Sequence, residues 1–204
     1  LRTRVTGVQG CGADLAALLT ERDIFRSSGA GTAIDDPDGS ERVEKLRIWR
    51  CEKIAGRADP AALRSVERTA RQLLGLLSPG GGLAPDGPDD HDLTARLLLA
   101  AFPDRVCKRR EDGGMVFIHS QGRGIRFKSA NSLMNSPYII AVTADAGEKT
   151  EGYIHLAAPV TEDIIRSECS RLISTRRKVE WDRKDGRIVA AAEERLGALL
   201  LSSR

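Results

Sequence analysis

Aromatic residues are scarce in this chain of 204 residues, at 4% of its composition. Stacking of nucleic-acid bases on exposed rings is therefore excluded as its main mode of binding. Histidine is rare as well, and the three histidines, His91, His119 and His155, lie far apart without metal-ligand spacing. Each is more typical of a surface or strand position than of a ligand, so the sequence predicts no metal site.

Paired cysteines are also missing. Four cysteines are scattered along the chain: Cys11, Cys51, Cys107 and Cys169. The absence of a Cys-x-x-Cys pair argues against a zinc site or a disulfide framework and favours reduced thiols. Cys107 with His119 or His155 on a neighbouring strand would offer a nucleophile and a base, but a buried thiol is the simpler interpretation.

Long apolar runs are absent too. The longest, such as residues 97–102, are far shorter than the ~20 residues that a bilayer requires, and no signal-peptide pattern opens the chain. We therefore expect a cytoplasmic protein that makes no membrane contact. The chain begins with Leu1 rather than Met, and residues 1–10 carry no helix start signal. We expect a piece cut from a longer protein.

The apolar periodicity of residues 1–78 predicts a helical domain. Asp14 is the expected N-cap of a first short amphipathic helix. Residues 27–39 are rich in glycine, proline and acidic residues and predict a long loop. Ser40 is the expected cap of a second helix, which should end near Gly56.

A third helix is predicted from Asp59-Pro60, an N-cap followed by a proline at the first helical position, to Leu77. Opposite its leucines, Arg64, Arg68 and Arg71 fall within roughly 60° of one another at ~100° per residue. This ridge is either a solvated face, with Glu67 as an intrahelical partner, or a surface that contacts phosphates.

The composition changes after residue 78. Residues 79–90 are rich in glycine, proline and aspartate and predict a linker and a domain boundary. Beyond it we expect a β-domain over residues 91–160. A C-terminal extension over residues 161–204 should hold a helix capped by Thr161 and a β-hairpin.

Short strands close to one another predict a barrel in this second part. After a short helix over residues 92–101, the expected strands are residues 105–110, 115–120, 124–128, 138–144 and 153–159. In the extension we expect a helix through Ile173, followed by strands over residues 178–183 and 187–192.

Positive charge is concentrated in residues 102–128, where seven basic residues face three acidic ones, a local charge of +4 against +3 for the whole chain. The seven are Arg105, Lys108, Arg109, Arg110, Arg123, Arg126 and Lys128. Because alternate residues of a strand point to opposite sides, such strands can turn one face to a core and the other to a polyanion. The alternative is a solvated strand face whose charge discourages aggregation.

Short stretches of the second part follow one another in a characteristic order: Phe102-Pro103-Asp104-Arg105-Val106, Arg109-Arg110, Gly122-Arg123-Gly124, Leu156-Ala157-Ala158-Pro159, Val179-Glu180-Trp181-Asp182 and Arg195-Leu196-Gly197-Ala198-Leu199. Upstream of them lie Asp14-Leu15-Ala16-Ala17-Leu18-Leu19 and Glu21-Arg22-Asp23-Ile24. Together these stretches resemble the C-terminal region of HrpB-type bacterial ATP-dependent helicases of the DEAH/RHA group.

The resemblance implies an α+β fold with a helical, ratchet-like part, a small oligonucleotide-binding-like (OB-like) β-barrel over residues 91–160 and a C-terminal extension. It also implies RecA-like motor domains elsewhere in the parent protein, which would bind ATP and Mg²⁺ and hydrolyse ATP. The printed chain contains no G-x-x-x-x-G-K-[ST] loop, D-E-x-H run or arginine-finger motif. We therefore expect this chain to be neither an enzyme nor a cofactor-binding protein by itself.

Two functions follow as hypotheses. In the first, the basic strands and the arginine ridge clamp the backbone of single-stranded RNA or DNA against the motor domains, with little sequence preference. In the second, the chain is a docking adapter that packs on the motor or another protein without touching nucleic acid. Salt dependence separates them, because only phosphate contacts weaken steeply with salt.

Overall fold

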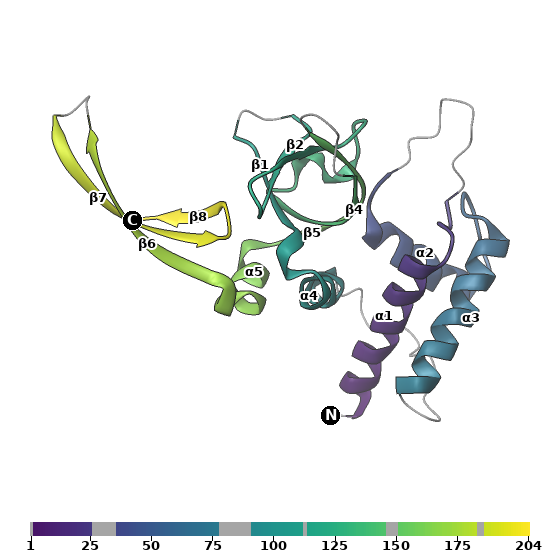
Figure 1. The fold of residues 1–204 in the computed structure, drawn as a ribbon. Helices are drawn as coiled ribbons and strands as arrows, with labels where there is room; N and C mark the ends of the chain where they lie inside the picture. The colour runs from purple at the N-terminus through teal and green to yellow at the C-terminus, as the bar shows by residue number, and fades with distance from the viewer. Residues whose placement is uncertain (1, 26–35, 78–90, 112–113, 146–150, 183–185) are drawn as a thin grey trace. The chain divides into compact units, whose positions relative to one another are not determined.

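The chain divides into two units, Leu1–Leu97 and Leu98–Arg204. The computed structural model describes residues 2–25, 36–77, 91–111, 114–145, 151–182 and 186–204 (Figure 1). The predicted linker at residues 79–90 and most of the predicted loop at residues 27–39 lie outside the described residues. Among those described, no helix combines the length and apolar character needed to cross a bilayer.

The first unit is helical, as predicted. Its helices are α1 (Arg2–Thr20), α2 (Gly39–Glu52), α3 (Pro60–Leu77) and the start of α4 (His91–Ala101). The prediction that Asp14 caps the first helix is wrong, because α1 already begins at Arg2. Both carboxylate oxygens of Asp14 accept hydrogen bonds from Arg50 of α2 at 2.5 Å. This buried ion pair, which α2 supplies, keeps an aspartate in the middle of a helix.

The next two helices begin with aspartate caps. Asp38, not Ser40, caps α2, since its carboxylate accepts the Ser40 amide hydrogen at 2.8 Å. The helix ends at Glu52, before the predicted Gly56, because Lys53 takes a left-handed conformation with φ of 59°. The Asp59-Pro60 start of α3 is confirmed, with the Asp59 carboxylate accepting the Ala61 amide hydrogen at 2.9 Å.

The core of the helical unit lies mainly between α1 and α3. Leu46, Leu63 and Val66 are fully buried there, together with Ala17 and Ile24. Each large aliphatic side chain in such a core contributes about 1.5–3 kcal/mol relative to an exposed one. The apolar stripe of the third helix is therefore its packing face, as the sequence predicts.

The second unit contains a closed five-stranded barrel with the strand order β1-β2-β3-β5-β4. Its strands are β1 (Val106–Arg109), β2 (Val116–His119), β3 (Gly124–Arg126), β4 (Tyr138–Ala144) and β5 (Gly152–Val160). β3 pairs with β5 in parallel and the other neighbours are antiparallel, so the barrel is OB-like, as predicted. A short 3-10 helix, η2 (Ser132–Asn135), connects β3 to β4.

The barrel interior is filled by alternate residues of its strands. Phe117 and Phe127 meet edge to face with ring centroids 5.5 Å apart. Cys107, Ile139 and Ala157 pack with them and are completely buried. The closed barrel therefore buries its apolar residues on the inside and turns the alternate positions outward.

The C-terminal extension follows α5 (Glu162–Glu168), whose predicted cap Thr161 is confirmed by a hydrogen bond from the Ile164 amide. The helix ends earlier than predicted, and Ile173 begins a strand. Instead of a hairpin alone, the extension forms a three-stranded sheet of β6 (Ile173–Asp182), β7 (Arg187–Leu196) and β8 (Leu199–Ser203). β-branched residues at the start of β6 favour the strand over a longer helix.

The base of this sheet is fastened to the barrel at the turn between β7 and β8. The Ala198 amide donates to the Ser120 carbonyl at 2.7 Å. Gly197 has φ of 58°, and a Cβ added there would overlap the same carbonyl. Arg166 of α5 also holds Glu194 of β7 at 2.8 Å. The base of the sheet and the barrel are thus joined by contacts that tolerate little change.

Candidate nucleic-acid interface

Two of the predicted phosphate-binding cations are engaged inside the protein. Arg105, at the end of the 3-10 helix η1 (Pro103–Arg105), donates to the Val142 carbonyl and lies 4.4 Å from the Phe102 ring centroid. Lys108 on β1 donates from Nζ to the Leu200 carbonyl at 2.6 Å. These two cations connect parts of the second unit, so they are poorly placed to bind an external phosphate.

Two further cations are partly engaged. Arg126 on β3 lies 3.9 Å from Glu151, and its Nε is buried without a hydrogen-bond partner among the described atoms. Arg109 on β1 reaches the Met134 carbonyl at 3.5 Å. Both side chains are only partly exposed, which leaves less of each guanidinium available to a ligand.

The remaining three cations of the basic segment are exposed: Arg110, Arg123 and Lys128. The Lys128 ammonium lies 5.4 Å from the Tyr153 ring centroid. Arg123 follows the turn between β2 and β3, where Gly122 takes φ of 86°. Arg123 and Lys128 therefore lie at opposite ends of β3, and Arg110 follows the end of β1.

The arginine ridge of α3 is exposed along its length, on the side opposite the buried leucines. Arg71 pairs with Glu67 at 2.6 Å, which is the intrahelical partner predicted from the sequence. Arg68 donates to the Ser65 hydroxyl at 3.2 Å. The ridge belongs to the first unit and the basic strands to the second, so a channel shared by both stays a prediction.

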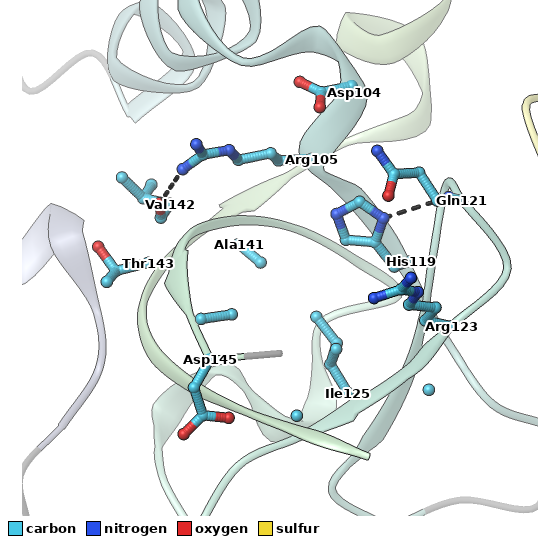
Figure 2. A pocket seen from close by; sticks show the side chains of 13 residues that line it. Asp104, Arg105, His119, Gln121, Arg123, Ile125, Ala141, Val142, Thr143 and Asp145 are labelled. Carbon is cyan, nitrogen blue, oxygen red and sulfur yellow. Dashed lines mark hydrogen bonds between the residues drawn. The ribbon is translucent and has the colours of Figure 1, made fainter. Parts of the chain in front are cut away.

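A groove of about 540 Å³ opens on the barrel (Figure 2). It is lined by Asp104, Arg105, His119, Gln121, Arg123, Gly124, Ile125, Ala141, Val142, Thr143, Ala144, Asp145 and Gly152. Figure 2 shows His119 and Arg123 close to each other, the Arg105 side chain extending away from them toward Val142, and Asp145 on the opposite side of the groove. The groove offers the exposed Arg123 guanidinium, the Gln121 side-chain amide, the Thr143 hydroxyl and apolar side chains such as that of Ile125.

The charges in the groove balance, since two arginines face two aspartates. Burial lowers the pKa of His119 below its usual 6.5, and the Arg105 and Arg123 charges lower it further against the opposing effect of Asp104. His119 Nδ1 accepts a hydrogen bond from the backbone amide of Gln121 at 3.2 Å, which also requires that Nδ1 carries no proton. The imidazole is therefore neutral at pH 7, and Arg123 is the exposed cation of the groove.

Asp145 marks the far end of the groove. Its carboxylate accepts the Tyr153 amide hydrogen at 2.6 Å, and this bond is the main reason why its pKa lies below the usual value. His155 lies 3.3 Å away and lowers the pKa further. The carboxylate is ionised at neutral pH and can accept hydrogen bonds from a base or a sugar.

The surroundings of Cys107 do not suit a catalytic nucleophile. The side chain is fully buried in the barrel core, and burial raises the pKa of the thiol to about 12. The thiol therefore stays protonated at neutral pH. Within the described part of the chain, no group of three or more histidine, cysteine, aspartate or glutamate side chains is arranged to hold a metal ion.

Sequence reasoning missed several polar residues of the groove. Gln121 adjoins the predicted Gly122 turn, and Asp145 opens the predicted connection after β4, so turn position was the available signal. Thr143 gave no such signal, because it lies within a strand. What brings these residues together is the closure of the barrel, which pairs β4 with both β1 and β5.

Comparison with known proteins identifies the region. Residues 172–204 match the model of the connector region of the ATP-dependent RNA helicase HrpB. The ATP-dependent RNA helicase HrpB of Escherichia coli (strain K12) is 30% identical over 134 residues, which cover 65% of this chain and 16% of that protein. The chain is similar to the C-terminal region of HrpB-type helicases. It spans about a sixth of the length of this curated relative.

Two solved structures agree with the HrpB assignment in fold. A crystal structure of the E. coli DExH-box NTPase HrpB matches 94% of this chain and 20% of its own, with a TM-score of 0.66 and 24% identity. A crystal structure of the Escherichia coli DEAH/RHA helicase HrpB matches 96% of this chain and 20% of the crystallised chain, with a TM-score of 0.67 and 21% identity.

A relative with a different name covers less of the chain. The nicotinate-nucleotide–dimethylbenzimidazole phosphoribosyltransferase of Salinispora tropica is 33% identical over 107 residues, half of this chain and 24% of that protein. The HrpB structures match nearly the whole fold, including the barrel and the helices. The fold of this chain is therefore similar to that of HrpB over nearly its whole length.

Proposed function

We propose that the HrpB-like chain is a nucleic-acid-binding accessory region of an ATP-dependent helicase. Its barrel holds the backbone of single-stranded RNA or DNA while motor domains of the parent protein, fuelled by ATP and Mg²⁺, pull the strand. The observation that carries this proposal is the barrel groove, which has the exposed Arg123 on its rim. OB-like barrels are a recurrent platform for single strands.

The proposed phosphate contacts are fewer than the charge of the segment suggests. Arg123 and Lys128 are exposed at opposite ends of β3, and Arg110 follows β1. Arg105 and Lys108 hold barrel and sheet together and contribute to binding only by keeping this surface in shape. Contacts of this kind read the backbone and give little sequence preference.

The arginine ridge supplies a second, separate set of contacts in this proposal. Arg64 and Arg68 are exposed on α3 and lie one helical turn apart, a spacing that suits successive phosphates of an extended strand. Arg71 is partly neutralised by Glu67 and should contribute less. The ridge and the barrel would then act on one strand, which is the clamp.

Salt titration tests the clamp. For the three barrel contacts alone, the slope of log affinity against log salt should be roughly −2, because each contact contributes about −0.7, and Arg64 and Arg68 would add about −1.4 if both sets hold one strand. Replacing Arg123 and Lys128 together by alanine should make the slope shallower by about 1.4. Lys108→Ala is the matched control, since Lys108 is a cation of the same segment that is engaged internally; it should leave the slope unchanged.

A slope near zero in the unmutated chain contradicts the clamp and favours the adapter function. One observation supports that second candidate: Leu76 and Leu77 at the end of α3 are 82% and 58% exposed. Apolar residues at such exposure suit a protein surface. Under the adapter function, Leu76→Ser with Leu77→Ser should weaken binding to the motor domains without any change in salt dependence.

A further inference from the structure

The outer part of the C-terminal sheet is a two-stranded ribbon with both faces open. β6 and β7 pair in unbroken register from Ile173↔Leu196 to Asp182↔Arg187. Among the described residues, β8 and the following Arg204 pair with β7 only near its base, between residues 192 and 196. Figure 1 shows β6 and β7 continuing together beyond β8. The described side chains of this outer ribbon are exposed, although ribbons of two strands rarely persist without a covering element.

One face of the ribbon is apolar near its tip. Trp181 lies directly opposite Ile188, and Val179 lies opposite Ala190, so these four residues share a face. Trp181, Ile188 and Val179 are 61%, 67% and 66% exposed. An exposed cluster of this kind, which includes one of the two tryptophans of the chain, indicates a surface that binds something.

One cation shares this apolar face. Arg177 is two residues before Val179 and therefore lies on the same face, while Arg176 and Lys178 lie on the other. On that other face Lys178 is 3.8 Å from Glu193, and Arg176 lies directly opposite Glu193 and helps to lower the pKa of its carboxyl. The exposed Arg177 lies opposite Ala192 and has no ion pair among the described residues. Over the whole paired ribbon, residues 173–182 and 187–196, the sequence has five basic and four acidic residues.

We propose that the Trp181 face of the ribbon is a second binding site for single-stranded nucleic acid. A base stacks on the Trp181 indole, and the Arg177 guanidinium contacts the adjoining phosphate. Stacking tolerates any base, and an arginine beside the ring supplies the charge that stacking lacks. The site shares its ligand class with the proposed function but lies on a different surface and stands on separate observations.

The charge decides between nucleic acid and a protein partner. A purely apolar face would suit the apolar side of another protein, but here the exposed Arg177 lies on the same face as Trp181, and its charge complements a polyanion. Trp181 and Arg177 also lie on alternate positions of one strand, about 13 Å apart along β6 at ~3.3 Å per residue. That separation allows one strand of nucleic acid to touch both.

Contacts between the base of the C-terminal sheet and the barrel fix the position of the proposed site relative to the barrel. The contacts of Ala198 with Ser120, of Arg166 with Glu194 and of Lys108 with Leu200 fix the start of the ribbon on the barrel. From Ile173 to Trp181 the strand then extends by about 26 Å at ~3.3 Å per residue. Trp181 therefore lies near the outer end of a hairpin whose base is hydrogen-bonded to the barrel.

Tryptophan fluorescence tests the proposal directly in the 204-residue chain. Trp49 is buried in the helical unit, so Trp49→Phe leaves Trp181 as the sole indole. Titration with oligothymidylate and oligouridylate of about 20 nucleotides, longer than the roughly 16 that one OB fold occupies, should quench its emission to saturation. Absence of quenching at concentrations where binding is seen by anisotropy would overturn the site.

Affinity measurements with ribbon variants complete the test. Trp181→Ala should weaken oligonucleotide binding by roughly tenfold, and Trp181→Phe should restore most of it because a ring remains. Val179→Thr is the matched control on the same face and should have little effect on affinity. If Trp181→Ala leaves oligonucleotide affinity unchanged, the site is wrong and the face serves a protein partner instead.

The outcome is separable from that of the barrel groove. With Arg123→Ala and Lys128→Ala combined, quenching of Trp181 should persist at higher oligonucleotide concentration. If the groove does not bind, the double variant has the affinity of the unmutated chain while Trp181 is still quenched. If the ribbon does not bind, the salt slope responds to the double variant while the emission of Trp181 stays constant.

Discussion

The barrel and the β6–β7 ribbon are both built from β-strands, yet large apolar side chains are buried in the barrel and exposed on the ribbon. In the barrel, closure places Phe117 and Ile139 inside at essentially no exposure. In the ribbon, Val179 and Trp181 are more than 60% exposed because no layer covers them. The strands of both regions contain apolar residues at alternate positions. These residues are buried in the barrel because its sheet closes on itself, and they stay exposed in the ribbon because it does not close.

The same contrast holds for the cations. Barrel residues Arg105 and Lys108 donate to backbone carbonyls and are thereby part of the structure. Ribbon residues Arg176 and Arg177 are exposed. Positive charge in a strand therefore indicates binding only where the tertiary structure leaves it outside. The predictions that follow test this contrast, beginning with the largest effect.

Removing a large side chain from each region should have very different effects on stability. Phe117→Ala deletes a ring that packs against Phe127 in the barrel core, and we expect a loss of about 3–5 kcal/mol in the free energy of unfolding. Trp181→Ala deletes a larger, exposed ring and should change it by less than about 0.5 kcal/mol. Urea denaturation measures both. A comparable loss for Trp181→Ala would mean that the ribbon face is covered in solution.

The attachment of the ribbon to the barrel depends on Gly197. Gly197→Ala puts a Cβ against the Ser120 carbonyl at a left-handed backbone, and we expect a loss of about 2–3 kcal/mol from strain and a weakened hydrogen bond. Gly186→Ala is the matched control, because φ is 63° there and the space around the Cβ is open. It should cost only about 1 kcal/mol.

Hydrogen exchange adds local resolution to this prediction. The Ala198 amide, which donates to Ser120, should exchange faster in Gly197→Ala than in the unmutated chain, while barrel amides such as that of Phe127 stay protected. If the two glycine variants lose equal stability and Ala198 remains protected, the ribbon is not fastened at this turn.

The smallest effect concerns pH and His119. Because its pKa in the folded barrel lies below the usual 6.5, the unfolded chain binds the proton first as the pH falls. The free energy of unfolding should therefore decrease as the pH is lowered from 8 through 6.5. In His119→Gln this part of the decrease should disappear, as followed by urea denaturation at pH 8 and pH 5.5. An equal decrease in both proteins would refute the role of His119.

Much of the fold could be predicted from the sequence because local signals were strong. The third helix begins at Asp59-Pro60, and Thr161 caps α5, as their residue types indicate. The barrel strands were predicted to within a few residues, since turn glycines such as Gly122 separate the apolar runs. The OB-like order was expected from family resemblance, and the strand pairing confirms it.

The errors arose where a distant residue decided the local structure. Asp14 looked like an N-cap until its Arg50 partner on α2 made it stable inside a helix. β8 was not predicted, because its short apolar run becomes a strand only by pairing with β7. Lys108 looked like a phosphate ligand, but the Leu200 carbonyl that it binds lies far along the chain.

The sequence by itself determined most of the helices and the barrel strands, the starts of α3 and α5, and that positive charge gathers in residues 102–128. These properties depend on neighbours within a few positions along the chain. Only the tertiary structure decided which cations are engaged, which of them line the groove, and that Trp181 is exposed. Those properties depend on residues brought together by barrel closure and by the pairing of β6, β7 and β8, and separation along the chain carries no information about them.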